Sequence, residues 1–281
     1  MLFFPNCKIN LGLNILRKRP DGFHDLETVF YPLPLKDALE LIPAGSTEPS
    51  FSSYGLPIPG DPADNLCLKA WRLIQQDFPG LPAIHIHLYK NIPIGAGLGG
   101  GSADGAWTLT GLNRLFNLNL SHEQLLQYAA QLGSDCAFFI LNTPCLGRGK
   151  GELLQPIRLN LSTYSFALVD PGIHISTARA FALCTPHEPG NSPQDTAGAT
   201  SLQDIVTQPI DTWSGALVND FEAPILQLHP ELQKINETLY AQGALYASLT
   251  GSGSSFFGIF PKHKAPAKSP FQKSYNYRIL P

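Results

Sequence analysis

The sequence has little of several features that would mark a specialised class of protein. Its 281 residues include five cysteines, an odd number, and no two of them form a C-x-x-C pair. A disulfide framework or a zinc site is therefore disfavoured, and buried reduced thiols are expected. No run of eighteen apolar residues occurs, so no membrane-spanning helix is expected. The apolar start ends at Pro5, which is too early for a signal peptide, and we expect a cytoplasmic protein.

An excess of one sign of charge is also missing. Nineteen Lys and Arg residues stand against 22 Asp and Glu residues, which gives a formal net charge of −3. A general nucleic-acid-binding protein would usually show a basic face, so we expect no nucleic acid as partner. No membrane is expected as partner either, because the long apolar run is missing. A small anionic ligand fits this balance, because one loop can bind a phosphate group without changing the net charge.

Glycine and proline, in contrast, are abundant, with 25 residues of each. They follow no collagen-like period and form no low-complexity block, which excludes fibrous and disordered classes. The chain is 43% hydrophobic. It is therefore long and apolar enough for one large domain or two small ones that share an interface.

The hydrophobic pattern predicts an α+β protein with two lobes, because strands and helices do not alternate regularly along the chain. We place the boundary between 155 and 163 and expect an N-terminal lobe at 1–158 and a C-terminal lobe at 159–281. A polar, proline-rich connector is expected at 185–200. Strands are predicted at 7–17, 24–33, 38–42, within 44–64, and at 84–89, 136–140, 145–147, 153–157, 164–169, 244–249, 255–260 and 275–280. Helices are predicted at 65–78, from 102 to about 116, and at 121–132, 176–183, 202–207, 220–228 and 230–241.

One segment concentrates five glycines between positions 95 and 101, directly before the helix predicted from Ser102. Glycine lets the backbone turn sharply and approach a ligand without interference from a Cβ atom. The start of the following helix offers free N–H groups and the positive end of the helix dipole. This combination predicts a phosphate site rather than a flexible surface loop. Its expected members are Pro93, Ile94, Gly95, Ala96, Gly97, Leu98, Gly99, Gly100, Gly101, Ser102 and Ala103.

Two familiar phosphate motifs fit this segment poorly. Gly95, Gly97 and Gly100 satisfy G-x-G-x-x-G, but a proline precedes them and no acidic residue ends a next strand, which disfavours a nicotinamide oxidoreductase. A Walker A loop requires Gly-Lys-Ser/Thr, and no lysine lies between Lys90 and Lys150.

The glycine segment instead resembles the phosphate loop of the galactokinase, homoserine kinase, mevalonate kinase and phosphomevalonate kinase superfamily. Further stretches resemble one family within it, the 4-diphosphocytidyl-2-C-methyl-D-erythritol kinases, in the family's order over about residues 5–260. These stretches begin at Asn6 (NCKINLGL), Arg19 (RPDGFH), Asp64 (DNLCLKA), Leu132 (LGSDCAFF), Asn219 (NDFE) and Leu249 (LTGSGS). A longer helix that the family commonly has near its C-terminus is ruled out here by prolines at 261, 266 and 270.

The resemblance implies an ATP-dependent kinase of the non-mevalonate route of isoprenoid (terpenoid) biosynthesis, which is a transferase that phosphorylates an alcohol. Asp135 matches the family's catalytic base, although by itself it would be read as a helix N-cap. Lys8 matches the catalytic lysine, although by itself it would be read as an ordinary strand lysine. The lysine would stabilise developing charge and keep the aspartate ionised.

On the substrate side, the resemblance implies a small molecule that carries a cytidine diphosphate group. Asn10, two residues beyond Lys8 and on the same strand face, would bind the erythritol part. His24 would read the cytosine edge and Phe181 would stack on the ring. Phe23 stands where the family usually has Tyr, which keeps an aromatic ring but loses the phenol. Further substrate contacts are expected from Ser176, Thr177, Thr250, Gly251 and Ser252.

For the nucleotide, the resemblance places adenine near Asn65, Leu66 and Lys90. Mg²⁺ would arrive with ATP and be held mainly by phosphates and water, so no metal-binding residue is assigned, His85 and His87 included. The alternatives are a sibling kinase that acts on another small alcohol and a non-catalytic ligand sensor on the same fold. We expect a monomer or a homodimer.

Overall fold

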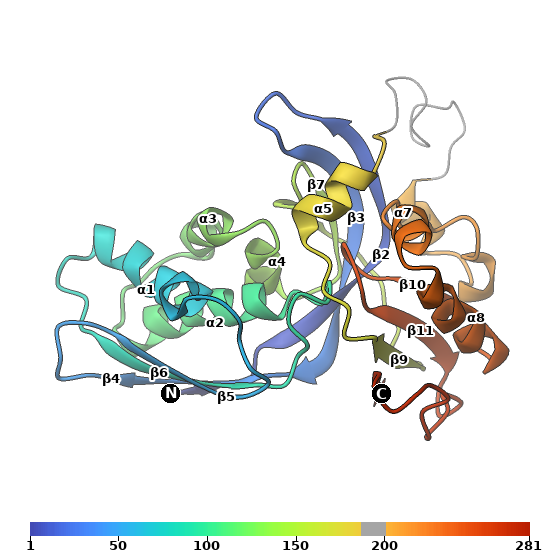
Figure 1. Cartoon of the computed structure of the whole chain (residues 1–281). Helices are drawn as coiled ribbons and strands as arrows, with labels where there is room; N and C mark the ends of the chain where they lie inside the picture. The colour runs from blue at the N-terminus through green and yellow to red at the C-terminus, as the bar shows by residue number, and fades with distance from the viewer. Residues whose placement is uncertain (187–200) are drawn as a thin grey trace. The chain divides into compact units, whose positions relative to one another are not determined.

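The computed structural model describes residues 1–186 and 201–281. Within this part, the packing of Cα atoms divides the chain into two compact units that are interleaved along the sequence (Figure 1). The strands β2 (Asn6–Lys18) and β3 (His24–Lys36) each pass from one unit into the other. Unit 1 comprises Met1–Lys8, Pro34–Ile94 and Gly99–Thr143, and unit 2 comprises Ile9–Leu33, Gly95–Leu98 and Pro144–Pro281.

Unit 1 contains a four-stranded sheet in the order β1-β4-β6-β5, with helices over one face (Figure 1). Strand β5 pairs with β6 in parallel, whereas the other neighbours are antiparallel. The strands are β1 (Leu2–Phe3), β4 (Ala38–Pro43), β5 (Ser50–Gly55) and β6 (Ile84–Lys90). The helices are η1 (Pro62–Asp64), α1 (Leu66–Asp77), α2 (Gly100–Leu115), α3 (His122–Leu132) and α4 (Cys136–Leu141).

Local sequence signals explain the elements of unit 1. The side chain of Asn65 caps α1 by accepting a hydrogen bond from the backbone N–H of Cys67 at 2.9 Å. Ser121 and Gln124 form the predicted capping box at the start of α3. Strand β6 alternates between buried and partly exposed residues, as expected for a strand covered on one face.

Unit 2 contains two four-stranded sheets, ordered β2-β3-β7-β8 and β10-β11-β9-β12. Helices α7 and α8 pack against the second sheet and bury Phe221, Ile225 and Leu239 in a common core with Leu249 and Phe256. Strand β12 lies at an edge of its sheet, as predicted. The further strands are β7 (Cys145–Arg148), β8 (Leu153–Pro156), β9 (Tyr164–Asp170), β10 (Tyr246–Leu249), β11 (Phe256–Pro261) and β12 (Asn276–Leu280). The helices are α5 (Thr177–Leu183), α6 (Leu202–Ile205), η2 (Ile210–Thr212), α7 (Glu222–Leu228), η3 (Pro230–Leu232) and α8 (Gln233–Ala241).

One predicted element is of the wrong type, and the bounds of several others shift by a few residues. Residues 136–140, predicted as a strand, form helix α4, which ends at Asn142 in the left-handed conformation. A short apolar run reads equally well as strand or helix, because periodicity cannot separate the two. Helix α2 begins at Gly100 rather than at Ser102, because two of the glycines adopt helical geometry.

The domain boundaries stay a prediction. The compact units exchange segments along the chain, and the proposed division into 1–158 and 159–281 is a linear one. The expected connector at 185–200 falls almost wholly outside the described residues. Among the residues that the structure describes, no helix combines the length and apolarity needed to cross a bilayer.

A buried asparagine ties α7 to the turn that follows β10. The side chain of Asn219 is 1% exposed and donates hydrogen bonds to the carbonyl oxygens of Leu249 and Gly251, both at 3.0 Å. Its own oxygen accepts a hydrogen bond from the N–H of Phe221 at 3.0 Å. Three backbone groups therefore depend on one side chain for their hydrogen bonds.

Replacing Asn219 with Ala would leave those buried groups unpaired, and we expect a loss of about 2–4 kcal/mol in the free energy of unfolding. Denaturant unfolding of the two proteins measures the difference. As a matched control, Asn160→Ala removes one exposed hydrogen bond to Ser162 and should change the stability by less than about 0.5 kcal/mol. Equal effects of the two substitutions would contradict the role given to Asn219.

Candidate active site

The predicted phosphate loop runs from the end of β6 into α2 and alternates between left-handed glycines and buried apolar residues. Gly95, Gly97 and Gly99 have φ angles of 66°, 78° and 70°. Ala96 and Leu98, between them, are buried. Gly99 is the N-cap of α2. The first N–H groups of a long helix thus follow a loop whose backbone lacks Cβ atoms, an arrangement suited to a phosphate group.

In unit 1 the two predicted catalytic side chains meet. The ammonium nitrogen of Lys8, in β2, lies 3.2 Å from Oδ2 of Asp135. Lys8 is buried, whereas the side chain of Asp135 is about one-third exposed. Asp135 occupies the N-cap position of α4, but its side chain makes no capping hydrogen bond to the described backbone. The carboxylate is therefore directed at Lys8 rather than used to cap the helix.

The glycine loop closes against the stem of this lysine. A Cβ atom built on Gly99 would lie 3.1 Å from both Cγ and Cε of Lys8 and 2.9 Å from the ring of Phe139. Glycine at this position is required twice, by the left-handed φ angle and by the lack of space. The backbone at the start of α2 and the Lys8–Asp135 pair thus belong to one packed cluster.

Lys90 has a different environment from the one expected. Its ammonium group is 2% exposed and forms ion pairs with Asp37 at 2.5 Å and Asp104 at 2.7 Å. Both carboxylates raise the pKa of Lys90 and together outweigh the opposing effect of burial. The side chain of Lys90 is thus bound to two aspartates. Its predicted contact with adenine stays a prediction.

The other unit 1 residues of the predicted nucleotide site lie around the two helix starts. Asn65 and Leu66 begin α1, and a Cβ atom on Gly105 of α2 would lie 3.0 Å from Cβ of Leu66. Pro93 is buried, and Ile94 is partly exposed. Gly100, Gly101, Ser102 and Ala103 form the first turn of α2.

In unit 2 the loop residues 95–98 pack against the second glycine turn. A Cβ atom on Gly97 would clash with the carbonyl oxygen of Thr250, and one on Gly251 would lie 2.8 Å from the oxygen of Gly97. The Thr250 hydroxyl accepts a hydrogen bond from the backbone N–H of Asn10 at 3.1 Å. Two segments that the sequence analysis singled out separately are thus in backbone contact.

Asn10 is buried, and its amide nitrogen donates to the hydroxyl of Thr28 at 2.9 Å. That hydroxyl in turn donates to the carbonyl oxygen of Gly12. Thr177, at the start of α5, lies 3.2 Å from the hydroxyl of Ser252. Ser176 caps α5 by accepting a hydrogen bond from the N–H of Arg179.

The two residues expected at a cytosine ring stack on each other. The rings of His24 and Phe181 are 4.6 Å apart and inclined by 10°, and Phe181 also meets the ring of Phe221 edge-on at 4.9 Å. Partial burial, with a smaller effect of Lys18, lowers the pKa of His24 below its ordinary value of 6.5. His24 is therefore a neutral imidazole at pH 7, with one donor and one acceptor nitrogen.

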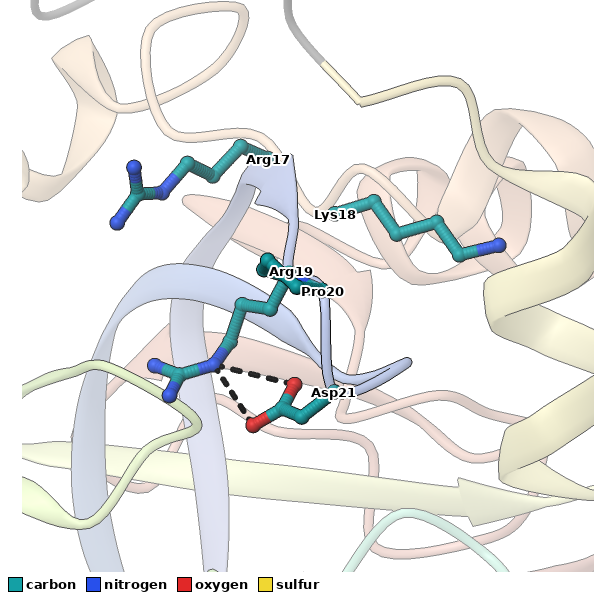
Figure 2. A pocket seen from close by; sticks show the side chains of 5 residues that line it. All are labelled: Arg17, Lys18, Arg19, Pro20 and Asp21. Atoms are coloured by element: carbon teal, nitrogen blue, oxygen red, sulfur yellow. Dashed lines mark hydrogen bonds and ion pairs between the residues drawn. The ribbon is translucent and has the colours of Figure 1, made fainter.

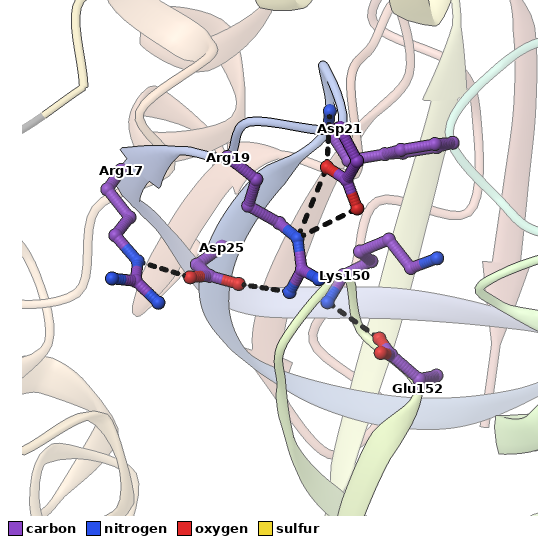
Figure 3. A network of polar contacts seen from close by, with 7 residues as sticks. Arg17, Arg19, Asp21, Asp25, Lys150 and Glu152 are labelled. Atoms are coloured by element: carbon purple, nitrogen blue, oxygen red, sulfur yellow. Dashed lines mark hydrogen bonds and ion pairs between the residues drawn. The ribbon is translucent and has the colours of Figure 1, made fainter.

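The ring of Phe23 lies next to the ammonium group of a lysine. Its ring is 53% exposed, and the ammonium of Lys150 sits 4.6 Å from the ring centroid. The N–H of Lys150 is held by Glu152 at 2.6 Å (Figure 3). A cation over an aromatic face is an attractive contact that needs no phenol hydroxyl.

Ion pairs stiffen the tip of the β2–β3 hairpin that carries Phe23 and His24. The carboxylate of Asp25 forms one ion pair with Arg17 at 2.5 Å and another with Arg19 at 2.9 Å (Figure 3). Arg19 also forms an ion pair with Asp21. The hydrogen bond from Arg17, followed by that from Arg19, lowers the pKa of Asp25. Residues 17–21 line a pocket of about 310 Å³, from which Lys18 extends away from both arginines (Figure 2).

Three residues of this region, Asp37, Asp104 and Lys150, were not predicted from the sequence. Asp104 carried a signal, because it is an acidic residue on the buried face of α2, whose other buried residues are uncharged. Asp37 is the single residue between β3 and β4, and Lys150 lies in the turn after β7, so only the fold shows their partners.

Comparison with known proteins decides the family. The family model described as GHMP kinases N terminal domain matches residues 65–143, and GHMP kinases C terminal matches residues 205–275. A 4-diphosphocytidyl-2-C-methyl-D-erythritol kinase of Bacteroides fragilis is 46% identical over 280 residues, covering 99% of this chain and 98% of the relative. One of Cytophaga hutchinsonii is 48% identical over 261 residues, covering 92% of each.

The chain belongs to the 4-diphosphocytidyl-2-C-methyl-D-erythritol kinase family. The crystal structure of a 4-(cytidine 5'-diphospho)-2C-methyl-D-erythritol kinase agrees, with a TM-score of 0.74 and 31% identity over 92% of this chain and 90% of that one. Mevalonate kinase of L. major shares the fold, with a TM-score of 0.68 at 16% identity over 100% of this chain and 95% of that one. The predicted superfamily, fold class and kinase family are thus confirmed.

Gly99→Ala tests the packing of the loop on Lys8. We expect the unfolding free energy to fall by about 1–3 kcal/mol, because the left-handed backbone and the crowded Cβ position both oppose a side chain. Gly101→Ala is the matched control: in the part of the chain that the structure describes, a Cβ atom there meets nothing within 4 Å. This helical change should raise the stability by up to about 1 kcal/mol. Effects of the same sign in both variants would contradict the packing.

Proposed function

We propose that this chain transfers the γ-phosphoryl group of ATP to the 2-hydroxyl of 4-diphosphocytidyl-2-C-methyl-D-erythritol, a step of the non-mevalonate isoprenoid pathway. The observation that carries the proposal is the Lys8–Asp135 contact at 3.2 Å, packed against Gly99 of the glycine loop. The names of the full-length relatives support the choice of alcohol.

Asp135 and Lys8 provide what an attacking alcohol requires. The carboxylate of Asp135 accepts the hydroxyl proton while the alcohol oxygen forms its bond to the γ-phosphorus and the bond to the ADP oxygen breaks. The partial exposure of Asp135 leaves it accessible to a hydroxyl group, whereas burial fixes the ammonium of Lys8. That ammonium stabilises the negative charge that develops on the attacking and transferred oxygens.

The glycine loop and the start of α2 are proposed to bind the phosphates of ATP through backbone N–H groups. Among the described residues, no group of three or more His, Cys, Asp or Glu side chains could hold a metal ion. We expect Mg²⁺ to arrive on ATP, bound mainly by phosphate oxygens and water. When bound, the ion would neutralise phosphate charge.

The cytidine end is assigned to unit 2. A neutral His24 can both donate to and accept from a base edge, and Phe181 offers a flat ring beside it. Thr177, Ser252 and the turn at Thr250 supply hydroxyl groups for the remaining polar atoms. The cytoplasmic location and the monomeric or homodimeric state stay predictions.

Lys8→Met and Asp135→Asn test the chemistry in a coupled assay of ADP release with the diphosphocytidyl alcohol. We expect each variant to lose about 10²- to 10⁴-fold in kcat with its fold intact by circular dichroism. Two substitutions at exposed residues, Lys234→Met and Asp211→Asn, serve as separate controls, and each should leave kcat unchanged. Wild-type turnover in folded Lys8→Met would contradict the mechanism. Turnover of homoserine or mevalonate in place of the diphosphocytidyl alcohol would identify a sibling kinase.

Phe181→Leu tests the assignment of the base. Loss of stacking should raise KM for the alcohol about tenfold while KM for ATP stays within about twofold. Phe271→Leu, in a separate aromatic cluster with Tyr275 and Tyr277, is the control and should change neither constant. A rise in KM for ATP instead of the alcohol would contradict this assignment.

A further inference from the structure

Three ionisable side chains are buried together in unit 1, beside the start of α2. The ammonium of Lys90 contacts Oδ2 of Asp37 at 2.5 Å and Oδ2 of Asp104 at 2.7 Å. Lys90, Asp37 and Asp104 are 2%, 1% and 3% exposed. Buried charge is costly unless it is paired and hydrogen-bonded. We therefore expect this buried cluster to have a role in the site.

Asp37 holds the near end of the phosphate loop. Besides Lys90, its carboxylate accepts hydrogen bonds from the backbone N–H groups of Asn91 and Ile92, at 2.6 and 2.8 Å. These are the two residues directly before Pro93, where the loop begins. One carboxylate thus receives three donors and fixes the path of the chain as it leaves β6.

Asp104 holds the far end of the loop. It lies in the second turn of α2, whose first turn begins at Gly100. The two ends nearly touch, because a Cβ atom on Gly100 would lie 2.8 Å from both Nζ of Lys90 and Cγ2 of Ile92. The ammonium of Lys90 therefore links the residues before the loop to the helix after it.

The charges identify the protonated member of the cluster. Two carboxylates and one ammonium would leave a net negative charge in a buried site. Asp37 has three donors, whereas among the described residues none donates a hydrogen bond to Oδ1 of Asp104. Burial, which outweighs the attraction of Lys90, raises the pKa of Asp104 to about 7, and its carboxyl is near enough to Asp37 to hydrogen-bond with it when protonated.

The groups around the cluster leave this assignment unchanged. The thiol of Cys67, on α1, faces all three charged residues, and burial keeps it protonated by raising its pKa far above neutrality. From β2, Cys7 faces Asp37 and Lys8, and its pKa is raised to about 12. Within α2, the hydroxyl of Thr108 donates to the backbone oxygen of Asp104.

We propose that Asp37, Lys90 and Asp104 are positioning residues that fix the two ends of the ATP-binding loop, with Asp37 as the carboxylate and Asp104 as the neutral acid. The proposal rests on the proposed function, because it takes this loop as the ATP site. It predicts that the two aspartates respond oppositely to the same change. An asparagine mimics a neutral acid at 104, but at 37 it turns an NH₂ group toward donors.

The test measures binding of ADP with Mg²⁺ by titration calorimetry to Asp37→Asn, Asp104→Asn and Asp104→Ala. We expect Kd to rise at least about tenfold in Asp37→Asn and Asp104→Ala, and by no more than about threefold in Asp104→Asn. The exposed carboxylate of Glu40, on β4, provides the control Glu40→Gln, which should bind as the wild type does. KM for ATP should follow Kd, whereas KM for the alcohol should stay constant.

The pH dependence separates positioning from a purely structural role. As the pH rises through about 7, Asp104 ionises and adds a buried negative charge next to an anionic ligand site. Kd for ADP should therefore rise between pH 6 and pH 8 in the wild type and stay flat in Asp104→Asn. The unfolding free energy of the wild type should also fall as the pH rises from 4 to 7, because only the folded state keeps Asp104 protonated in this range. Asp104→Asn should lack this fall.

Each outcome decides the proposal. Equal damage from Asp37→Asn and Asp104→Asn, or unchanged Kd in folded Asp37→Asn, would overturn it. If Asp37→Asn does not fold, the comparison of Asp104→Asn with Asp104→Ala and the pH profile decide alone. If ADP binding changes as expected but the diphosphocytidyl alcohol is not phosphorylated, the proposed function fails and the positioning role stands. If the wild type does not bind ADP, both fail.

Discussion

The missing Cβ atoms between Gly97 and Gly100 are the constraint on which the candidate site depends. At Gly97 the backbone approaches the carbonyl oxygen of Thr250, at Gly99 it approaches the stem of Lys8, and at Gly100 it approaches the ammonium of Lys90. Each approach leaves a Cβ atom less room than an ordinary van der Waals contact. The loop is therefore held by its surroundings, and a rigid row of N–H groups costs less entropy on binding a phosphate than a mobile one.

Two lysines of unit 1 show how solvent access separates a chemical role from a positioning role. Lys8 and Lys90 are both buried, and each contacts a carboxylate. The partner of Lys8, Asp135, is partly exposed and can receive a proton from a substrate, whereas both partners of Lys90 are buried. A carboxylate that exchanges protons with a ligand must reach it, so only the first pair can take part in the reaction.

Much of the fold followed from the sequence, because the signals were local. The cap at Asn65, the capping box at Ser121 and the alternation along β6 each depend on residues close in sequence, and the structure bears them out. The Lys8–Asp135 contact spans more than a hundred residues, and only the resemblance to a family made it predictable. What failed was of two kinds. The apolar run at 136–140 had no distinguishing period, and the partners of Lys90, at the end of β6, come from α2 and from the residue before β4.

Phe23 stands where the family usually has Tyr, and its surroundings explain why the hydroxyl is not needed to hold the ring. A phenol would add a hydrogen bond, but the ring here lies over the ammonium of Lys150, which interacts with the aromatic face. That face is nearly the same in Phe and Tyr. Lys150 is itself placed by the turn after β7, where Gly149 accepts a hydrogen bond from the N–H of Leu26 at 2.7 Å. The position of the ring is therefore set by β3 and this turn, and the hydroxyl is dispensable for holding it.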